Sequence, residues 1–239
     1  MSRTIALAAL LVSVGCASAA PPQPDFPEPR NEAELDARLR FLEQRLAAGH
    51  LHAAAWSFGW LGIQVFSGIS QIQDAAAARE SGDRSRDIVN AVKSTVGVAD
   101  VLVIRPMPGR QGAAPLREMP DGTEDARLAR LARGEEILLA TADRAAAHRS
   151  WKVHVGNVLF NLAGTAVLLG LGHEDAAATT LASGAIGGEI QIWTEPWRGT
   201  RDLADYEHLV QTGHASAPGT GPHWFLAPAC DGLALQMRF

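Results

Sequence analysis

Two long stretches without formal charge constrain the fold of this chain more than any other feature. The first covers residues 51–73, where His52 is the one titratable side chain, and the second covers residues 153–172. A helix of about 20 apolar residues is long enough to cross the roughly 30 Å hydrocarbon core of a bilayer. Both stretches are therefore predicted to be helices that either span a membrane or lie buried in a bundle.

Polar side chains follow one face of each stretch. In the second stretch Asn157, Asn161 and Thr165 stand at successive four-residue steps, and in the first Gln64 shares a face with other uncharged polar residues. Glycines that permit close contact between membrane helices accompany both stripes. In a membrane bundle the stripes would line the interior, whereas in a soluble bundle they would be the wet face. The pattern favours membrane association.

Each long stretch is followed, after a charged link, by a shorter apolar segment. These segments cover residues 88–104 and 176–193, and each is closed by a proline, Pro106 or Pro196, because the residue before a proline disfavours the helical conformation. The chain therefore contains two helical hairpins. The glycine and proline positions of the two hairpins match, since the spacing of Gly97, Pro106 and Gly109 equals that of Gly187, Pro196 and Gly199. This match predicts an internal duplication, with chance resemblance of helical hairpins as the alternative.

A further helix precedes each hairpin. Asn31 and Glu34 form a capping box ahead of leucines at helical spacing, and Gly49 is expected to end this amphipathic helix. Thr123 is expected to begin a charged helix that runs through Arg149 and can continue directly into the second hairpin. The predicted fold class is all-α: a helical bundle built from two related helical hairpins.

The N-terminus has the pattern of a secretory signal. Residues 1–19 contain Arg3, an uncharged stretch and a run of small residues that suits cleavage after Ala19. The alternative is lipidation at Cys16, although Ser13 stands where a lipobox usually has an aliphatic residue. A proline-rich spacer over residues 20–30 follows. The protein is therefore predicted to be exported to the cell envelope.

Composition divides the rest of the chain. Residues 31–109 hold the amphipathic helix and the first hairpin, and residues 110–122 form a Gly/Pro loop. Residues 123–199 hold the charged helix and the second hairpin. Residues 200–239 are predicted to form a C-terminal helix and a short extended tail.

Two acids inside the hairpins are the first candidates for a site. Asp100 and Glu189 each follow the matched glycine by a few residues, so they could form a paired site that binds a ligand or an ion. The structural alternative is that each pairs with a nearby base (Arg105, Lys93 or Arg198) or caps a backbone. The polar stripes add three uncharged candidates to this site: Asn157, Asn161 and Gln64.

Composition and motifs argue against several other classes. With 26 acidic and 21 basic residues the net charge is −5, which excludes a basic nucleic-acid surface. Two cysteines exclude a disulfide scaffold. The sequence contains no phosphate-binding glycine loop, nucleophile elbow or His-Glu-x-x-His motif. No enzymatic activity, cofactor or metal is therefore predicted.

The functional expectation is an exported, membrane-associated helical protein with a structural or interaction role in the envelope. Its expected partners are membrane lipid or other envelope proteins, and it could form a homo-oligomer. Two alternatives stay open: a soluble periplasmic carrier of a lipid or other apolar ligand, and a transport element that uses the paired acids in a polar bundle interior.

Overall fold

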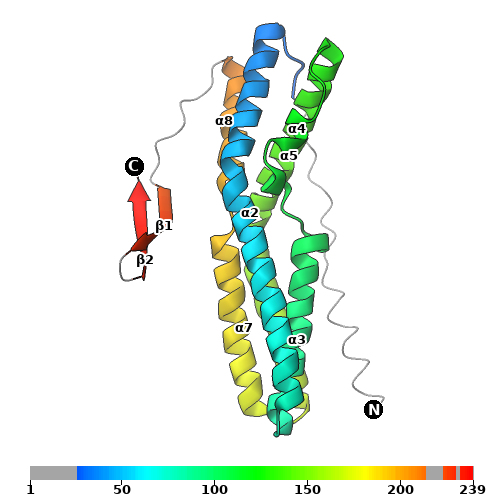
Figure 1. The fold of residues 1–239 in the computed structure, drawn as a ribbon, viewed down its shortest axis with the longest axis vertical. Coiled ribbons are helices and arrows are strands. Elements are labelled where there is room, and N and C mark those ends of the chain that lie inside the picture. The colour runs from blue at the N-terminus through cyan, green and yellow to red at the C-terminus, as the bar shows by residue number, and fades with distance from the viewer. Residues whose placement is uncertain (1–25, 214–222, 230–231, 239) are drawn as a thin grey trace.

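The computed structural model describes residues 26–213, 223–229 and 232–238 and shows an elongated all-α bundle (Figure 1). Cys16, the predicted signal and most of the predicted proline-rich spacer lie outside the described residues. The elements are α2 (Glu32–Ala77), α3 (Ser81–Ala99), the π-helical turn η2 (Asp100–Ile104), the 3-10 turn η3 (Pro108–Gln111), α4 (Ala114–Arg117), α5 (Glu124–His148), α6 (Trp151–Gly170), α7 (Glu174–Thr194) and α8 (Arg198–Thr212). The strands β1 (His223–Ala229) and β2 (Gly232–Arg238) pair antiparallel, so the predicted extended tail is a short hairpin.

Helix α2 extends over the whole length of the bundle. Its 46 residues span about 69 Å at about 1.5 Å per residue. Asn31 caps it as predicted by accepting a hydrogen bond from the Glu34 backbone N–H, at 2.9 Å. The expectation that Gly49 ends this helix is wrong. A helical glycine costs only about 1 kcal/mol, and the turns that follow are held by burial of Ala53 and Trp56.

The charged helix α5 is separate from α6, the first helix of the second hairpin. Thr123 begins α5 by accepting a hydrogen bond from the Ala126 N–H, as its cap, but α5 ends at His148 and α6 begins at Trp151. Backbone bonds of the tighter i to i+3 type close α5, and the Ser150 hydroxyl donates to a carbonyl oxygen of that last turn, at 2.6 Å. The possible direct continuation of α5 into α6 is therefore not observed.

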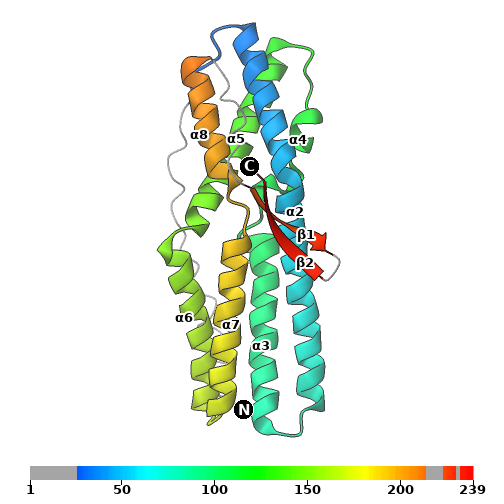
Figure 2. The same ribbon diagram turned by 90° about the vertical axis from the view of Figure 1, so that its left-hand side faces the viewer.

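The bundle has two halves, which Figure 2 shows one above the other. The polar half consists of residues 32–50 of α2 together with α4, α5 and α8. The apolar-faced half consists of residues 51–77 of α2 together with α3, α6 and α7. In the latter, α2 packs on α3 and α6 packs on α7, and α3 contacts both helices of the second pair.

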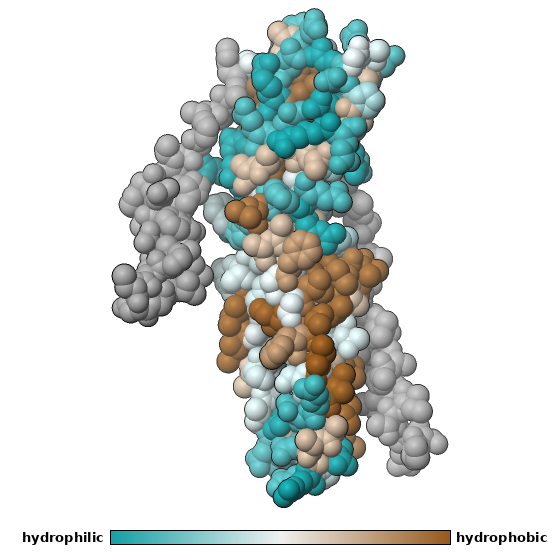
Figure 3. Space-filling model, viewed as in Figure 1, coloured by the Kyte–Doolittle hydropathy of each residue, from teal (hydrophilic) through white to brown (hydrophobic). Residues whose placement is uncertain are grey.

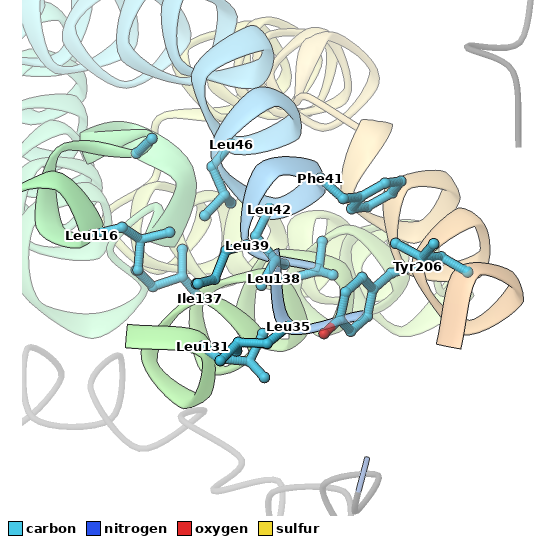
Figure 4. Packing of buried hydrophobic residues seen from close by; sticks show 12 residues of the cluster. Leu35, Leu39, Phe41, Leu42, Leu46, Leu116, Leu131, Ile137, Leu138 and Tyr206 are labelled. Carbon is cyan, nitrogen blue, oxygen red and sulfur yellow. The ribbon is translucent and has the colours of Figure 1, made fainter. Parts of the chain in front are cut away.

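The hydrophobic core of the molecule lies in the polar half. Figure 4 shows side chains from α2, α5 and α8 meeting around Leu39, Leu42 and Leu138. Its buried members are Leu35, Leu39, Phe41, Leu42, Leu46, Ala113, Leu116, Leu131, Ile137, Leu138, Tyr206 and Leu209. This half thus folds as an ordinary water-soluble helical bundle, with apolar side chains inside and charges outside.

A buried polar network crosses this core. Arg38, 1% exposed, donates to the Glu34 carboxylate at 2.6 Å and to the Pro27 carbonyl oxygen at 2.7 Å. The Tyr206 hydroxyl donates to Glu135. Burial raises the pKa of Glu135. Arg30 and Arg38 hold the pKa of Glu34 at about 2, below its ordinary 4.5, against the opposing effect of burial.

We expect Leu42→Ala to lower the free energy of unfolding by about 2–5 kcal/mol, because it opens a cavity in this core. Leu42 is fully buried, whereas Leu51 on the same helix is 77% exposed. Leu51→Ala is therefore the matched control and should change stability by no more than about 0.5 kcal/mol. Chemical unfolding of the purified protein in mild detergent, followed by circular dichroism, measures both. Equal effects would contradict this placement of the core.

The lowered pKa of Glu34 predicts how stability depends on pH. Its folded-state pKa of about 2 lies below the unfolded value of 4.5, so its stabilisation is complete above pH 4.5 and is lost as pH falls towards 2. Glu34→Gln removes this contribution. The difference in stability between wild type and variant should be largest near neutral pH and shrink steadily in acid. A difference that is constant from pH 6 to pH 2 would show that Glu34 is not ion-paired.

Candidate functional site

The apolar-faced half exposes its large hydrophobic side chains. All 23 exposed large hydrophobic residues of the described helices and turns lie at residues 51–104, 151–171 and 186–197, and none lies on α4, α5 or α8. Phe66 is 74% exposed and Leu159 52%. Figure 3 shows these side chains as a brown band over the lower half, between a polar upper half and a polar lower tip.

The interior of the same half is polar. Asn161 is 2% exposed and Thr180 is fully buried, and Ser57, Ser94 and Thr165 are buried with them. The apolar residues buried beside them are mostly alanines. Outside and inside are thus reversed relative to the polar half of the molecule.

A row of hydrogen bonds runs along the interior face of α6. His154 Nδ1 lies 2.7 Å from Glu189 Oε2 of α7, and Asn157 Nδ2 donates to Glu189 Oε1 at 3.0 Å. One turn further, Asn161 Nδ2 donates to Asn157 Oδ1 at 2.9 Å. The Thr165 hydroxyl ends the row by donating to the backbone carbonyl oxygen of Asn161 at 2.9 Å. The predicted stripe is therefore a bonded row that faces α7.

Glycines on α7 make room for this row. A Cβ atom at Gly188 would lie 2.5 Å from the Asn157 amide carbon, and one at Gly184 would lie 1.9 Å from Asn161 Oδ1. The same point at Gly184 lies 2.4 Å from Lys93 Nζ, which reaches in from α3. Lys93 has no carboxylate partner among the described side chains. Because both atoms lie so near the same point, the Lys93 ammonium group is close to Asn161 Oδ1.

The first hairpin repeats this arrangement in outline. A Cβ at Gly97 of α3 would lie 2.7 Å from the Gln64 amide carbon. Deeper in the bundle the Ser94 hydroxyl donates to the Gln71 side chain at 3.2 Å. In both hairpins an amide side chain of one helix thus occupies the space over a glycine of the other.

The structure places the two predicted acids in separate pairs. Asp100 accepts from Arg105 Nε at 2.7 Å, which is the structural alternative raised from the sequence. Glu189 pairs with His154 and Asn157. No hydrogen bond or ion pair joins Asp100 to Glu189 among the described residues. Lys93, which the sequence offered as a possible partner of these acids, pairs with neither of them. His154 was not predicted as a site residue, although it stands three residues before Asn157 and so continues its face.

The junction between the halves is held by a second polar cluster. Arg144 Nε of α5 donates to Glu195 Oε1 at 2.7 Å, and His148 Nδ1 lies 2.8 Å from Glu195 Oε2. The Trp56 and Trp60 indole groups both donate to the Thr194 hydroxyl, each at 3.3 Å. Five of the six tryptophans lie at this level of the bundle: Trp56, Trp60, Trp151, Trp193 and Trp197.

Within the described residues α6 alone is long and apolar enough to cross a membrane by length and composition. Its 20 residues have a mean hydropathy of 1.5 over the most apolar stretch, of which only 22% is buried. The core helix of a water-soluble protein would be mostly buried. The described part of the chain holds no group of three or more His, Cys, Asp or Glu side chains arranged to bind a metal ion.

No known family model, curated protein or solved structure matches this chain.

We expect Gly188→Ala to destabilise the α6–α7 pair, because the new methyl group would displace the Asn157 amide from Glu189 and from the Ala185 carbonyl oxygen. A loss of about 1–3 kcal/mol follows from overpacking and broken hydrogen bonds. The neighbouring Gly187 has open space at its Cβ position, so Gly187→Ala is the control and should be neutral or stabilising. Thermal unfolding in mild detergent distinguishes them; an equal loss in both would contradict this packing.

Proposed function

We propose that the protein is an envelope protein whose apolar-faced half is embedded in a membrane while its polar half projects into water. The reversal of polarity between the two halves carries this proposal. Fully burying one large apolar side chain is worth about 1.5–3 kcal/mol, and such side chains cover one half of the bundle only. Lipid would take up this surface, whereas water would leave it unfavourably exposed.

The dimensions of the apolar-faced half support the same proposal. The 20 residues of α6 span about 30 Å, which is the thickness of the hydrocarbon core. One end of the band carries the tryptophans of the junction, as expected where an aromatic ring meets headgroups. The other end carries charged turns, including Arg79 and Glu80 after α2 and Glu174 at the start of α7.

The interior chemistry also suits a membrane. Polar groups in hydrocarbon are costly unless they are bonded within the protein, and His154, Asn157 and Glu189 satisfy one another. A soluble carrier would keep its apolar faces inside, around a ligand, so the outward direction of these faces favours the membrane over the carrier.

The finer parts of the proposal come from the sequence. We propose export through the signal at residues 1–19, a spacer at residues 20–30, and duplication of an ancestral helical hairpin. The amide-over-glycine contacts in both hairpins support the duplication. The proposed role is structural or interactive, with lipid or another envelope protein as partner and no catalytic activity.

A transport role is the second candidate, and the bonded row from Glu189 to Thr165 favours it. Such a row could conduct protons or coordinate a small cation. Reconstituted vesicles test it, since Glu189→Gln should lower ion or proton flux at least tenfold if the row is a pathway. Unchanged flux, or no flux above empty vesicles, would remove this candidate.

Cell fractionation with an alkaline carbonate wash tests the membrane proposal. The full chain and its Cys16→Ser variant should both stay in the membrane pellet, because the helices themselves are embedded and no lipid anchor is needed. Release of both into the supernatant would overturn the proposal. Release of the variant alone would mean that a lipid at Cys16 is the anchor.

We expect Leu159→Arg to reduce stable membrane insertion, because it places a charge on the exposed face of α6. Arginine near the centre of a spanning helix costs about 2.5–3.5 kcal/mol on insertion scales. Ala132 is exposed near the middle of α5 in the polar half, so Ala132→Arg is the control and should insert normally. The fraction retained after the carbonate wash measures the difference. Equal retention would show that this face of α6 does not meet lipid.

A further inference from the structure

A pocket of about 280 Å³ opens at the junction, at the level of the tryptophans. Its walls come from the end of α5, the start of α6 and the segment between α7 and α8, and include His148, Arg149, His154, Trp193, Glu195 and Trp197. In the proposed membrane orientation this pocket lies at the depth of the lipid headgroups.

The acids in and beside the pocket have partners within the protein. Glu195 is paired with the Arg144 guanidinium at 2.7 Å and lies 2.8 Å from His148. Glu189 lies 2.7 Å from His154 Nδ1 and accepts a hydrogen bond from Asn157 at 3.0 Å. Both carboxylates are therefore held by other side chains of the protein.

Two basic groups of the α5–α6 connection have no acidic partner. Arg149 lines the pocket and is exposed, and its guanidinium group is held 5.0 Å from the centre of the Trp197 ring. Lys152 is exposed in the first turn of α6, three residues further along the chain. Neither forms an ion pair with any described residue.

The start of α6 also favours an anionic ligand. The N-terminus of α6 lies beside the pocket, and the Ser150 side chain does not cap it. Helix N-termini present unpaired N–H groups and a partial positive charge, which favour phosphate.

An apolar groove continues from the pocket along α7. It is shallow and is lined by residues between Ala185 and Thr194, among them Ile186 and Ile190, and it shares Trp193 with the pocket. It runs from the junction towards the middle of the apolar band. A cationic pocket joined to an apolar groove has the two ends that a phospholipid requires.

We propose that the junction pocket binds the phosphate of an anionic phospholipid, with an acyl chain of that lipid along the α7 groove. Arg149 at the pocket wall and Lys152 in the first turn of α6 supply the positive charge, and Trp193, which the pocket and the groove share, lies between headgroup and chain. Basic pockets between membrane helices recognise anionic headgroups in this way. This inference rests on the proposed membrane function and names the partner of its junction.

The test uses the purified full chain in a neutral detergent, with thermal unfolding as the readout. Added short-chain phosphatidylglycerol should raise the unfolding temperature, because a ligand that binds the folded state stabilises it. Short-chain phosphatidylcholine at the same concentration should have little effect. Glycerol phosphate, which has the anion without the chains, should also have little effect, since the α7 groove would stay empty.

Substitutions locate the effect. The pair Arg149→Gln with Lys152→Gln should weaken the apparent affinity for phosphatidylglycerol roughly ten- to thirtyfold. The control pair is Arg40→Gln with Arg117→Gln, which removes two exposed arginines of the polar half and should leave the affinity unchanged. The charge-preserving pair Arg149→Lys with Lys152→Arg should keep most of it, and serves if the glutamine pair unfolds.

Each contrary result has a defined meaning. Equal stabilisation by phosphatidylcholine would overturn the preference for an anion, and equal stabilisation by glycerol phosphate would replace the lipid with a free phosphate compound. Loss of affinity in the control pair but not in the junction pair would place the site elsewhere. If the carbonate wash releases the protein, the membrane function fails; if the protein is retained but shows no preference for phosphatidylglycerol, only the lipid site fails.

Discussion

The reversal of polarity along α2 is the constraint on which the rest of the structure depends. Its first half buries Leu35, Leu39 and Leu42 against α5 and α8, whereas its second half exposes Phe66 and other large apolar side chains. Because α2 is one continuous helix, the exposed apolar side chains of its second half cannot fold back into the core of its first half. The remaining helices follow this division, because α5 and α8 complete an apolar core while α3, α6 and α7 enclose polar groups. The opposite burial patterns of the two halves of α2 therefore define two halves of the molecule.

The junction lies where the exposed surface of the bundle changes from polar to apolar. Arg144 connects α5 to Glu195 and to the Arg105 and Pro106 carbonyl oxygens, so one guanidinium group connects three separate segments of the chain. Tryptophans surround this cluster, and their amphipathic rings suit the boundary between hydrocarbon and water. The break between α5 and α6 falls at the same level. The proposed lipid pocket lies at this level because α5 and α7 both end here. At the same level the large apolar side chains of α2 change from buried to exposed.

Local sequence signals were reliable where the structure is decided locally. The caps at Asn31 and Thr123 and the interior stripe of Asn157 and Asn161 follow from short-range chemistry and helical periodicity. The prediction that the helix ends at Gly49 was wrong, because the free-energy cost of a helical glycine is small compared with the stabilisation from packing of the turns that follow it. Asp100 pairs with Arg105 of its own segment, which the sequence offered as the alternative. The partners of Glu189 lie on α6 and depended on which helices face each other, and helical spacing within a single segment carries no information on that.

The sequence by itself determined that the chain is helical, that uncharged polar stripes accompany two long apolar stretches, and that shorter apolar segments follow them. These are properties of periodicity and composition, which a single helix expresses alone. Only the tertiary structure decided which face of each helix is inside. An amphipathic helix fits a water-soluble bundle or a membrane bundle equally well, since both bury one face. The choice depends on what the neighbouring helices present, and around Asn161 they present Lys93 and glycines rather than leucines.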